Sequence, residues 1–161
     1  MTTHNYSFKD FNKDHMAKAV GVSLPVSTKF SVEICRWIRN RRLEEARKML
    51  EEVIKLNKAV PFKRYNWNLG HKKTSNGPGR YPIKTSKEVL KLLKSVEANA
   101  QFTGLNTQSL VINHICAHKA SSHWHYGRHR GRKMKRTTIE VVVKESAQEK
   151  ERKKGKEVKS S

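Results

Sequence analysis

The chain has 161 residues, of which 35 are Lys or Arg and 14 are Asp or Glu, so its formal charge is +21. This length allows one domain with a modest core. So large an excess of positive charge repels itself unless a polyanion neutralises it, and nucleic acid is the commonest polyanion. A membrane surface is the rival partner, but the sequence has no apolar run of about 18 residues and no signal-peptide pattern. We therefore expect a soluble, cytoplasmic, nucleic-acid-binding protein with no membrane partner.

The N-terminal half predicts one short strand and two helices. Residues 18–22 (KAVGV) have strand character, whereas residues 1–14 have no clear pattern. Apolar residues recur at helical spacing over about 28–40 and again over about 43–56, which indicates two amphipathic helices. The basic run 39–42 between them reads as a turn.

The middle of the chain predicts a long loop and a third helix. Residues 61–82 show no periodicity and contain the turn sequence NGPG, so we read them as one loop. Structureless loops of this length are usually functional or disordered. A helix is expected over 85–102, with Thr85 and Glu88 forming a capping box and Gly104 as its C-terminal stop.

After the third helix the hydrophobic period changes from 3.6 to 2. Alternation over 110–117 and over 138–143 predicts two strands. About twenty residues separate them, whereas a hairpin loop normally has two to five. The excess predicts an extended hairpin over 108–145 whose middle projects beyond a single α+β domain of residues 1–146. Residues 147–161 are rich in Lys, Glu and Ser, which is typical of a disordered tail.

The projecting arm carries the functional signal. Between residues 119 and 136 it combines cations, aromatic side chains and two glycines, with no acidic residue. Arginine binds phosphate bidentately, and aromatic rings stack on unpaired bases. A solvated charge run is the alternative reading, but exposed aromatics and an excess of arginine argue against it. Because an isolated two-stranded ribbon is marginally stable in water, we expect RNA to order the arm.

The residues expected to bind RNA come from the loop 61–82, from the start of the third helix and from the arm. In the loop and the helix start they are Lys63, Arg64, His71, Lys72, Lys73, Arg80 and Lys84. In the arm and at its base they are His118, Lys119, Trp124, Tyr126, Arg128, Arg130, Arg132, Lys133, Lys135 and Arg136.

The sequence predicts neither a metal site nor a catalytic one. His114, Cys116 and His118 would share one face of a strand, but their spacing matches no zinc signature. Cys35 and Cys116 lie in apolar stretches, so we expect two buried, unpaired thiols. Nucleophile elbow, P-loop and dinucleotide motifs are all absent from the sequence. We therefore expect no cofactor and no enzymatic activity.

Several segments, in order and spacing, carry a resemblance to a known family. They are Val60-Pro61-Phe62-Lys63, Gly70-His71-Lys72, Gly79-Arg80-Tyr81-Pro82, Ala98-Asn99-Ala100, Ile112-Asn113-His114, Ala117-His118-Lys119, Arg128-His129-Arg130-Gly131-Arg132 and the strand 138–143. They resemble archaeal members of ribosomal protein family L twenty-two, whose eukaryotic counterpart is called L seventeen. The resemblance covers roughly residues 17–145. It departs at His129, where alanine is usual, and over residues 121–126, which are rich in His, Trp and Tyr.

The resemblance implies three helices packed on a small antiparallel sheet, with a long protruding β-hairpin. It also implies a structural, non-enzymatic constituent of the large ribosomal subunit that binds large-subunit rRNA and supports assembly. The hairpin tip, Arg128, His129, Arg130, Gly131 and Arg132, would line the polypeptide exit tunnel and meet the nascent polypeptide. The globular part would lie near the tunnel mouth beside neighbouring ribosomal proteins, with no homo-oligomer. A free RNA-binding regulator or RNA chaperone is the alternative.

Overall fold

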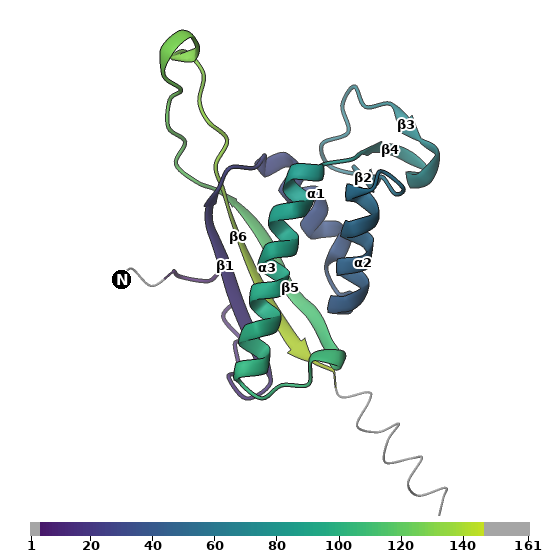
Figure 1. The fold of residues 1–161 in the computed structure, drawn as a ribbon, viewed down its shortest axis with the longest axis vertical. Coiled ribbons are helices and arrows are strands. Elements are labelled where there is room, and N and C mark those ends of the chain that lie inside the picture. Colours follow the sequence, from purple (N-terminus) through teal and green to yellow (C-terminus); the bar gives the residue numbers. More distant parts are fainter. Residues whose placement is uncertain (1–3, 147–161) are drawn as a thin grey trace, which may run out of the picture.

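The main sheet of the computed structural model, which describes residues 4–146, has three antiparallel strands in the order β1-β6-β5 (Figure 1). They are β1 (Met16–Leu24), β5 (Leu110–Lys119) and β6 (Thr137–Glu145). The central position of β6 explains its burial, because both of its edges are paired and Ile139, Val141 and Val143 join the core. The three predicted strands are therefore confirmed, and each extends at one or both ends by at most two residues beyond the pattern.

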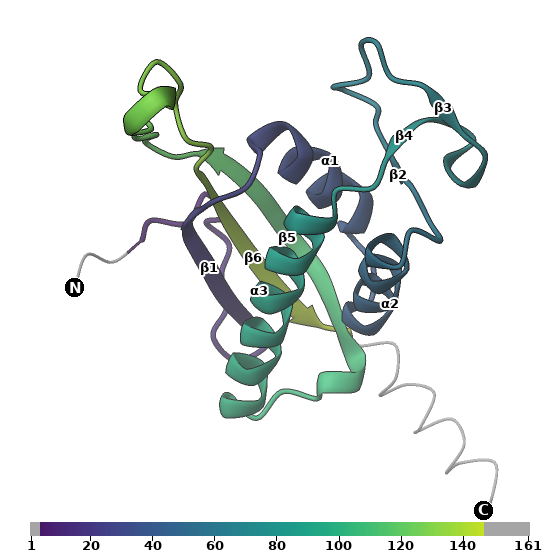
Figure 2. The same cartoon turned by 45° about the horizontal axis from the view of Figure 1, so that its top comes forward.

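Three helices cover one face of this sheet (Figures 1 and 2). They are α1 (Thr28–Ile38), α2 (Leu43–Ile54) and α3 (Ile83–Phe102). α3 lies along β1, α1 packs against β5, and α2 packs on α3. The predicted apolar stripes meet in one core, where Ile34, Leu50 and Leu93 are fully buried. The α+β fold class, with helices packed on a small antiparallel sheet and a protruding hairpin, is confirmed.

The helix ends differ from the sequence prediction. α1 ends at Ile38 because Arg39 takes an extended backbone and Asn40 a left-handed one, with a φ of 61°. α3 begins at Ile83, before the predicted capping box, so Thr85 is buried inside the first turn and does not cap. Pro82 fills the position before α3, where a missing N–H costs no intrahelical bond. Gly104 is the predicted C-terminal stop, with a φ of 76°.

The prediction of one loop over 61–82 is wrong, because this region holds a second small sheet. Its strands are β2 (Val60–Pro61), β3 (His71–Lys72) and β4 (Gly77–Arg80), in the order β2-β4-β3. Strands of two to four residues are too short to show a period in the sequence. Gly79 is buried in β4 against Ser75, where a side chain would have no room.

Residues 4–11, which the sequence left unassigned, pack against the main sheet. The Phe8 ring lies 5.5 Å from the His114 ring, and the Lys18 ammonium lies 4.7 Å from the Tyr6 ring centroid and 4.4 Å from that of Phe11. Across residues 4–146, no helix is both long and apolar enough to cross a membrane. The tail predicted over 147–161 lies outside the described residues.

Candidate nucleic-acid interface

The arm, defined here as residues 120–136, projects beyond the paired ends of β5 and β6 (Figure 1). Regular pairing ends at Lys119 and Thr137. Further out, three backbone hydrogen bonds cross the arm, from Ala120 to Arg136 (3.2 Å), His125 to Arg132 (2.9 Å) and Met134 to His123 (2.7 Å). Every residue from 123 to 133 is exposed. The arm therefore projects as predicted, but as an irregular ribbon rather than as a continuation of the two strands.

The outer part of the arm presents cations and aromatic rings to solvent. Tyr126 is 87% exposed and Trp124 is 59% exposed, with the Lys133 ammonium 4.7 Å from its ring centroid. Gly127 has a φ of 62° and starts the single helical turn, Gly127–His129, that forms the tip. Arg128, Arg132 and Lys135 make no side-chain hydrogen bond or ion pair with any residue in the described range 4–146. Their donors are therefore available for phosphate.

Two predicted RNA-binding residues at the base of the arm contact the protein itself. Arg136 is half-buried and donates from Nη1 to the Ser23 carbonyl (3.1 Å), which ties the arm to the end of β1. His118 Nε2 lies 3.2 Å from Glu140 Oε1, and its side chain is 44% exposed. Lys119 is exposed between them. These contacts orient the start of the arm, whereas the Lys119 side chain has no such contact within residues 4–146.

The second sheet carries the other predicted cations, and a buried carboxylate positions it. Glu33 on α1 is buried and accepts backbone hydrogen bonds from Lys63 (3.1 Å), Arg64 (2.8 Å) and Tyr65 (2.7 Å). These backbone bonds leave the Lys63 and Arg64 side chains exposed. The other predicted residues here, His71, Lys72, Lys73, Arg80 and Lys84, are exposed too. Glu33 has no sequence signal for this role, because only the tertiary structure brings this α1 residue to the loop.

The arm and the second sheet emerge at the same end of the molecule. Figures 1 and 2 both show them on either side of the start of α1. The two basic regions are thus separate surfaces that face in a common direction. A folded polyanion such as RNA can contact both at once, since its phosphates are spread over many segments.

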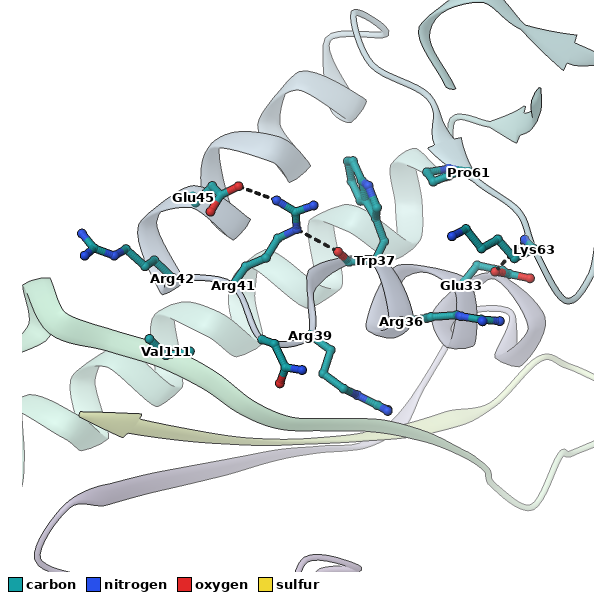
Figure 3. Close-up of a pocket in the computed structure, with 11 residues that line it drawn as sticks. Glu33, Arg36, Trp37, Arg39, Arg41, Arg42, Glu45, Pro61, Lys63 and Val111 are labelled. Atoms are coloured by element: carbon teal, nitrogen blue, oxygen red, sulfur yellow. Dashed lines mark hydrogen bonds and ion pairs between the residues drawn. The ribbon is translucent and has the colours of Figure 1, made fainter. Parts of the chain in front are cut away.

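A third basic surface, the α1–α2 pocket, lies at the corner between α1 and α2 (Figure 3). It has a volume of about 620 Å³, and its lining includes Arg36, Trp37, Arg39, Arg41, Arg42 and Lys63. The arginines were not among the predicted RNA-binding residues, because the run 39–42 was interpreted as a turn. The signal that could have identified them was the density of arginine, since a turn needs no such charge.

The predicted histidine-rich face of β5 is confirmed, and it surrounds a buried acid. Glu140 is fully buried on β6 and accepts hydrogen bonds from the Ser7 backbone and hydroxyl, while His114 Nε2 lies 3.0 Å away. Burial raises the pKa of Glu140, but the hydrogen bonds from Ser7, His114 and His118 outweigh it and lower the pKa to about 2. These bonds attach the N-terminal segment to the sheet.

Candidate metal ligands also meet here, since donor atoms of Cys116, His118 and Glu140 lie within 4.8 Å of one another. Both Glu140 carboxylate oxygens already accept hydrogen bonds, so the cluster is satisfied as a protein network. Cys116 is half-buried beside it, and the expectation of a buried thiol is wrong for this residue. Cys35 is buried as expected, and burial raises its pKa to about 12.

The Glu33 bonds predict a local effect of the substitution Glu33→Gln. A glutamine has one acceptor oxygen and no charge, so at least one of the three part-buried N–H groups loses its partner. We expect the free energy of unfolding to fall by about 1–3 kcal/mol. Amide hydrogen exchange at residues 63–65 should accelerate. The control is Glu45→Gln, which removes an exposed i,i+4 pair with Arg41 and should cost no more than about 0.5 kcal/mol. Equal effects of the two variants would contradict the anchoring role.

The Glu140 network predicts a pH-dependent stability. Because the pKa of Glu140 is lower in the folded protein than in the unfolded chain, its contribution is complete above about pH 4.5 and is lost as the pH falls toward 2. We expect Glu140→Gln to lower the free energy of unfolding by about 2 kcal/mol at pH 6 and by clearly less at pH 3. Urea denaturation at the two pH values measures both. The same difference at pH 6 and pH 3 would show that ionised Glu140 does not stabilise the fold.

Residues 19–144 match the family model described as ribosomal protein L22p/L17e. "Large ribosomal subunit protein uL22" of Archaeoglobus fulgidus is 41% identical over 150 residues, which cover 89% of this chain and 97% of that protein. The uL22 protein of Staphylothermus marinus is also 41% identical, over 90% of this chain and 99% of its own. That of Thermofilum pendens is 44% identical over 74% of this chain and 78% of its own. The chain therefore belongs to the L22p/L17e family of ribosomal proteins.

Proposed function

We propose that the chain is a structural constituent of the large ribosomal subunit and that its arm holds large-subunit rRNA. The observation that carries the proposal is the arm itself, which is cationic, free of acidic residues and exposed from residue 123 to residue 133. Three cross-strand backbone bonds are too few to fix such a ribbon in water. A surrounding polyanion supplies both the neutralising charge and the missing contacts.

Family membership supports the ribosomal location, and the geometry supports a division of labour. The arm reaches between RNA segments, while the second sheet and the α1–α2 pocket bind RNA at the body of the domain. The residues proposed for the arm are led by Arg128, Arg130 and Arg132, all exposed at or next to the tip. His118 and Arg136 contribute by orienting the base of the arm.

The tip is proposed to line part of the exit tunnel. In this arrangement residues 128–132 face the nascent polypeptide, and the globular part lies near the tunnel mouth against neighbouring ribosomal proteins. The support is geometric, since the tip is the part of the arm farthest from the core (Figure 1). The role is structural, and one copy of the chain serves one subunit.

A triple substitution tests the proposal. Arg128→Gln, Arg130→Gln and Arg132→Gln together should leave the domain folded, because all three side chains are exposed. Each lost phosphate contact lowers the slope of log affinity against log salt by about 0.7–0.9, so the slope for large-subunit RNA should fall by about 2–3. Incorporation into large subunits, measured by sedimentation, should decrease.

The matched control removes three exposed lysines from the helices, Lys48, Lys87 and Lys94, so the net charge changes equally. The control variant should keep most of its slope and its incorporation. If the arm variant and the control behave alike, the charge is general and the arm has no special role. If the unaltered protein sediments wholly in ribosome-free fractions at low salt, a free RNA-binding regulator replaces the ribosomal assignment.

A further inference from the structure

We infer that the α1–α2 pocket receives one unpaired nucleotide of the RNA, with its base stacked on Trp37 and its phosphate bound by Arg36 and Arg39. The inference rests on the proposed RNA-binding function and names a separate contact, whose lining includes no residue of the arm. Its ligand is defined by chemistry as a π-faced base attached to a phosphate. Four features of the pocket carry it.

The first feature is charge. Five cationic side chains and two carboxylates line the pocket. The cations outnumber the carboxylates, and Glu45 neutralises one of them by pairing with Arg41 at 2.5 Å. The pocket therefore keeps a net positive charge that favours an anion.

The second feature is order among the arginines. Arg41 donates from Nε to the Trp37 carbonyl (3.1 Å), and Arg39 donates from Nη2 to the Ile115 carbonyl (2.8 Å). A guanidinium has five N–H donors, so each of these side chains retains donors after its protein bonds are made. Arginines already held in place lose less side-chain entropy on binding, which favours a specific site over a diffuse one.

The third feature is the indole of Trp37. It is half-buried on α1, and Figure 3 shows it directed into the space between Arg41 and Pro61. Trp37 packs against the core, and the Lys58 ammonium lies 5.9 Å from its ring centroid, so the ring is held in place. An acidic peptide side chain offers no ring to stack on it. A nucleobase does offer a flat ring to stack on the indole, and base–aromatic stacking contributes about 1–3 kcal/mol per base.

The fourth feature is size and place. The volume of about 620 Å³ falls within the range of about 300–1,000 Å³ that small-ligand pockets occupy. Lys63 lines the pocket and also belongs to the basic segment that Glu33 positions. The pocket is thus continuous with a surface already proposed to bind RNA, so a strand that crosses the second sheet can place one base in it.

Trp37 fluorescence gives a local test in the full-length protein. The chain has three tryptophans, and the other two are exposed, Trp67 at 87% and Trp124 at 59%. Replacing both by Phe should therefore leave the fold intact and Trp37 as the sole reporter. This protein is titrated with hexa-adenylate and with an abasic hexamer that carries the same phosphates.

We expect hexa-adenylate to quench Trp37, and the abasic hexamer to bind about fivefold more weakly without quenching it. Arg36→Gln should weaken the quenching titration, because Arg36 is an exposed pocket cation. Lys48→Gln, which removes an exposed cation of α2 outside the pocket lining, should leave it unchanged.

Two outcomes would overturn the inference. Equal binding of the two hexamers with an unchanged Trp37 signal would reduce the pocket to a phosphate contact. Displacement of hexa-adenylate by hexaglutamate at equal concentration would assign the pocket to an acidic protein segment. Either result leaves the arm proposal standing, because that proposal is read from the salt slope of large-subunit RNA and not from Trp37.

Discussion

Buried carboxylates that accept hydrogen bonds from flanking segments are the interaction on which the placement of this chain's charge depends. Glu33 holds the backbone of residues 63–65, and Glu140 holds Ser7, His114 and His118. In each case an acid inside the domain positions a segment that belongs to no helix and to no strand of the main sheet. Anchoring through the backbone leaves the Lys63 and Arg64 side chains directed outward. A chain with 35 basic and 14 acidic residues can thus fold without neutralising the cations its partner needs.

Periodicity predicted the helices and strands that bury one continuous face of apolar side chains. The stripes of α1, α2 and α3 and the alternation of β5 and β6 were correct because each buries a whole face in one core. The second sheet was missed for the opposite reason. Its strands have two to four residues, too few to show a period. The region is held by the buried Val60 and Phe62, by the close packing of Gly79, and by the Glu33 bonds to the segment that follows β2. Tertiary contacts of this kind leave no local signal in the sequence.

The residues of the candidate site were predictable where they are neighbours in the sequence. They were not predictable where the fold alone brings them together. In the arm the cations, the aromatics and the lack of acids stand side by side in the sequence, and most of its predicted side chains are exposed. His118 and Arg136 have the same composition-based signal, yet they contact Glu140 and Ser23, which come from other strands. The arginines of the α1–α2 pocket show the opposite error. They were not predicted to bind RNA, because the run 39–42 was explained as a turn between two helices.

The contrast between domain and arm explains how such a protein can be both stable and adaptable. The domain is fixed by a core of fully buried aliphatic side chains, so the base of the arm starts from a rigid direction set by β5, β6 and the Arg136–Ser23 bond. The arm has three cross-strand bonds and no buried face. If RNA surrounds the arm as proposed, the RNA sets its final path, and the ordering entropy is lost only on binding. This makes the arm's shape a property of the complex, whereas its position and charge are properties of the chain.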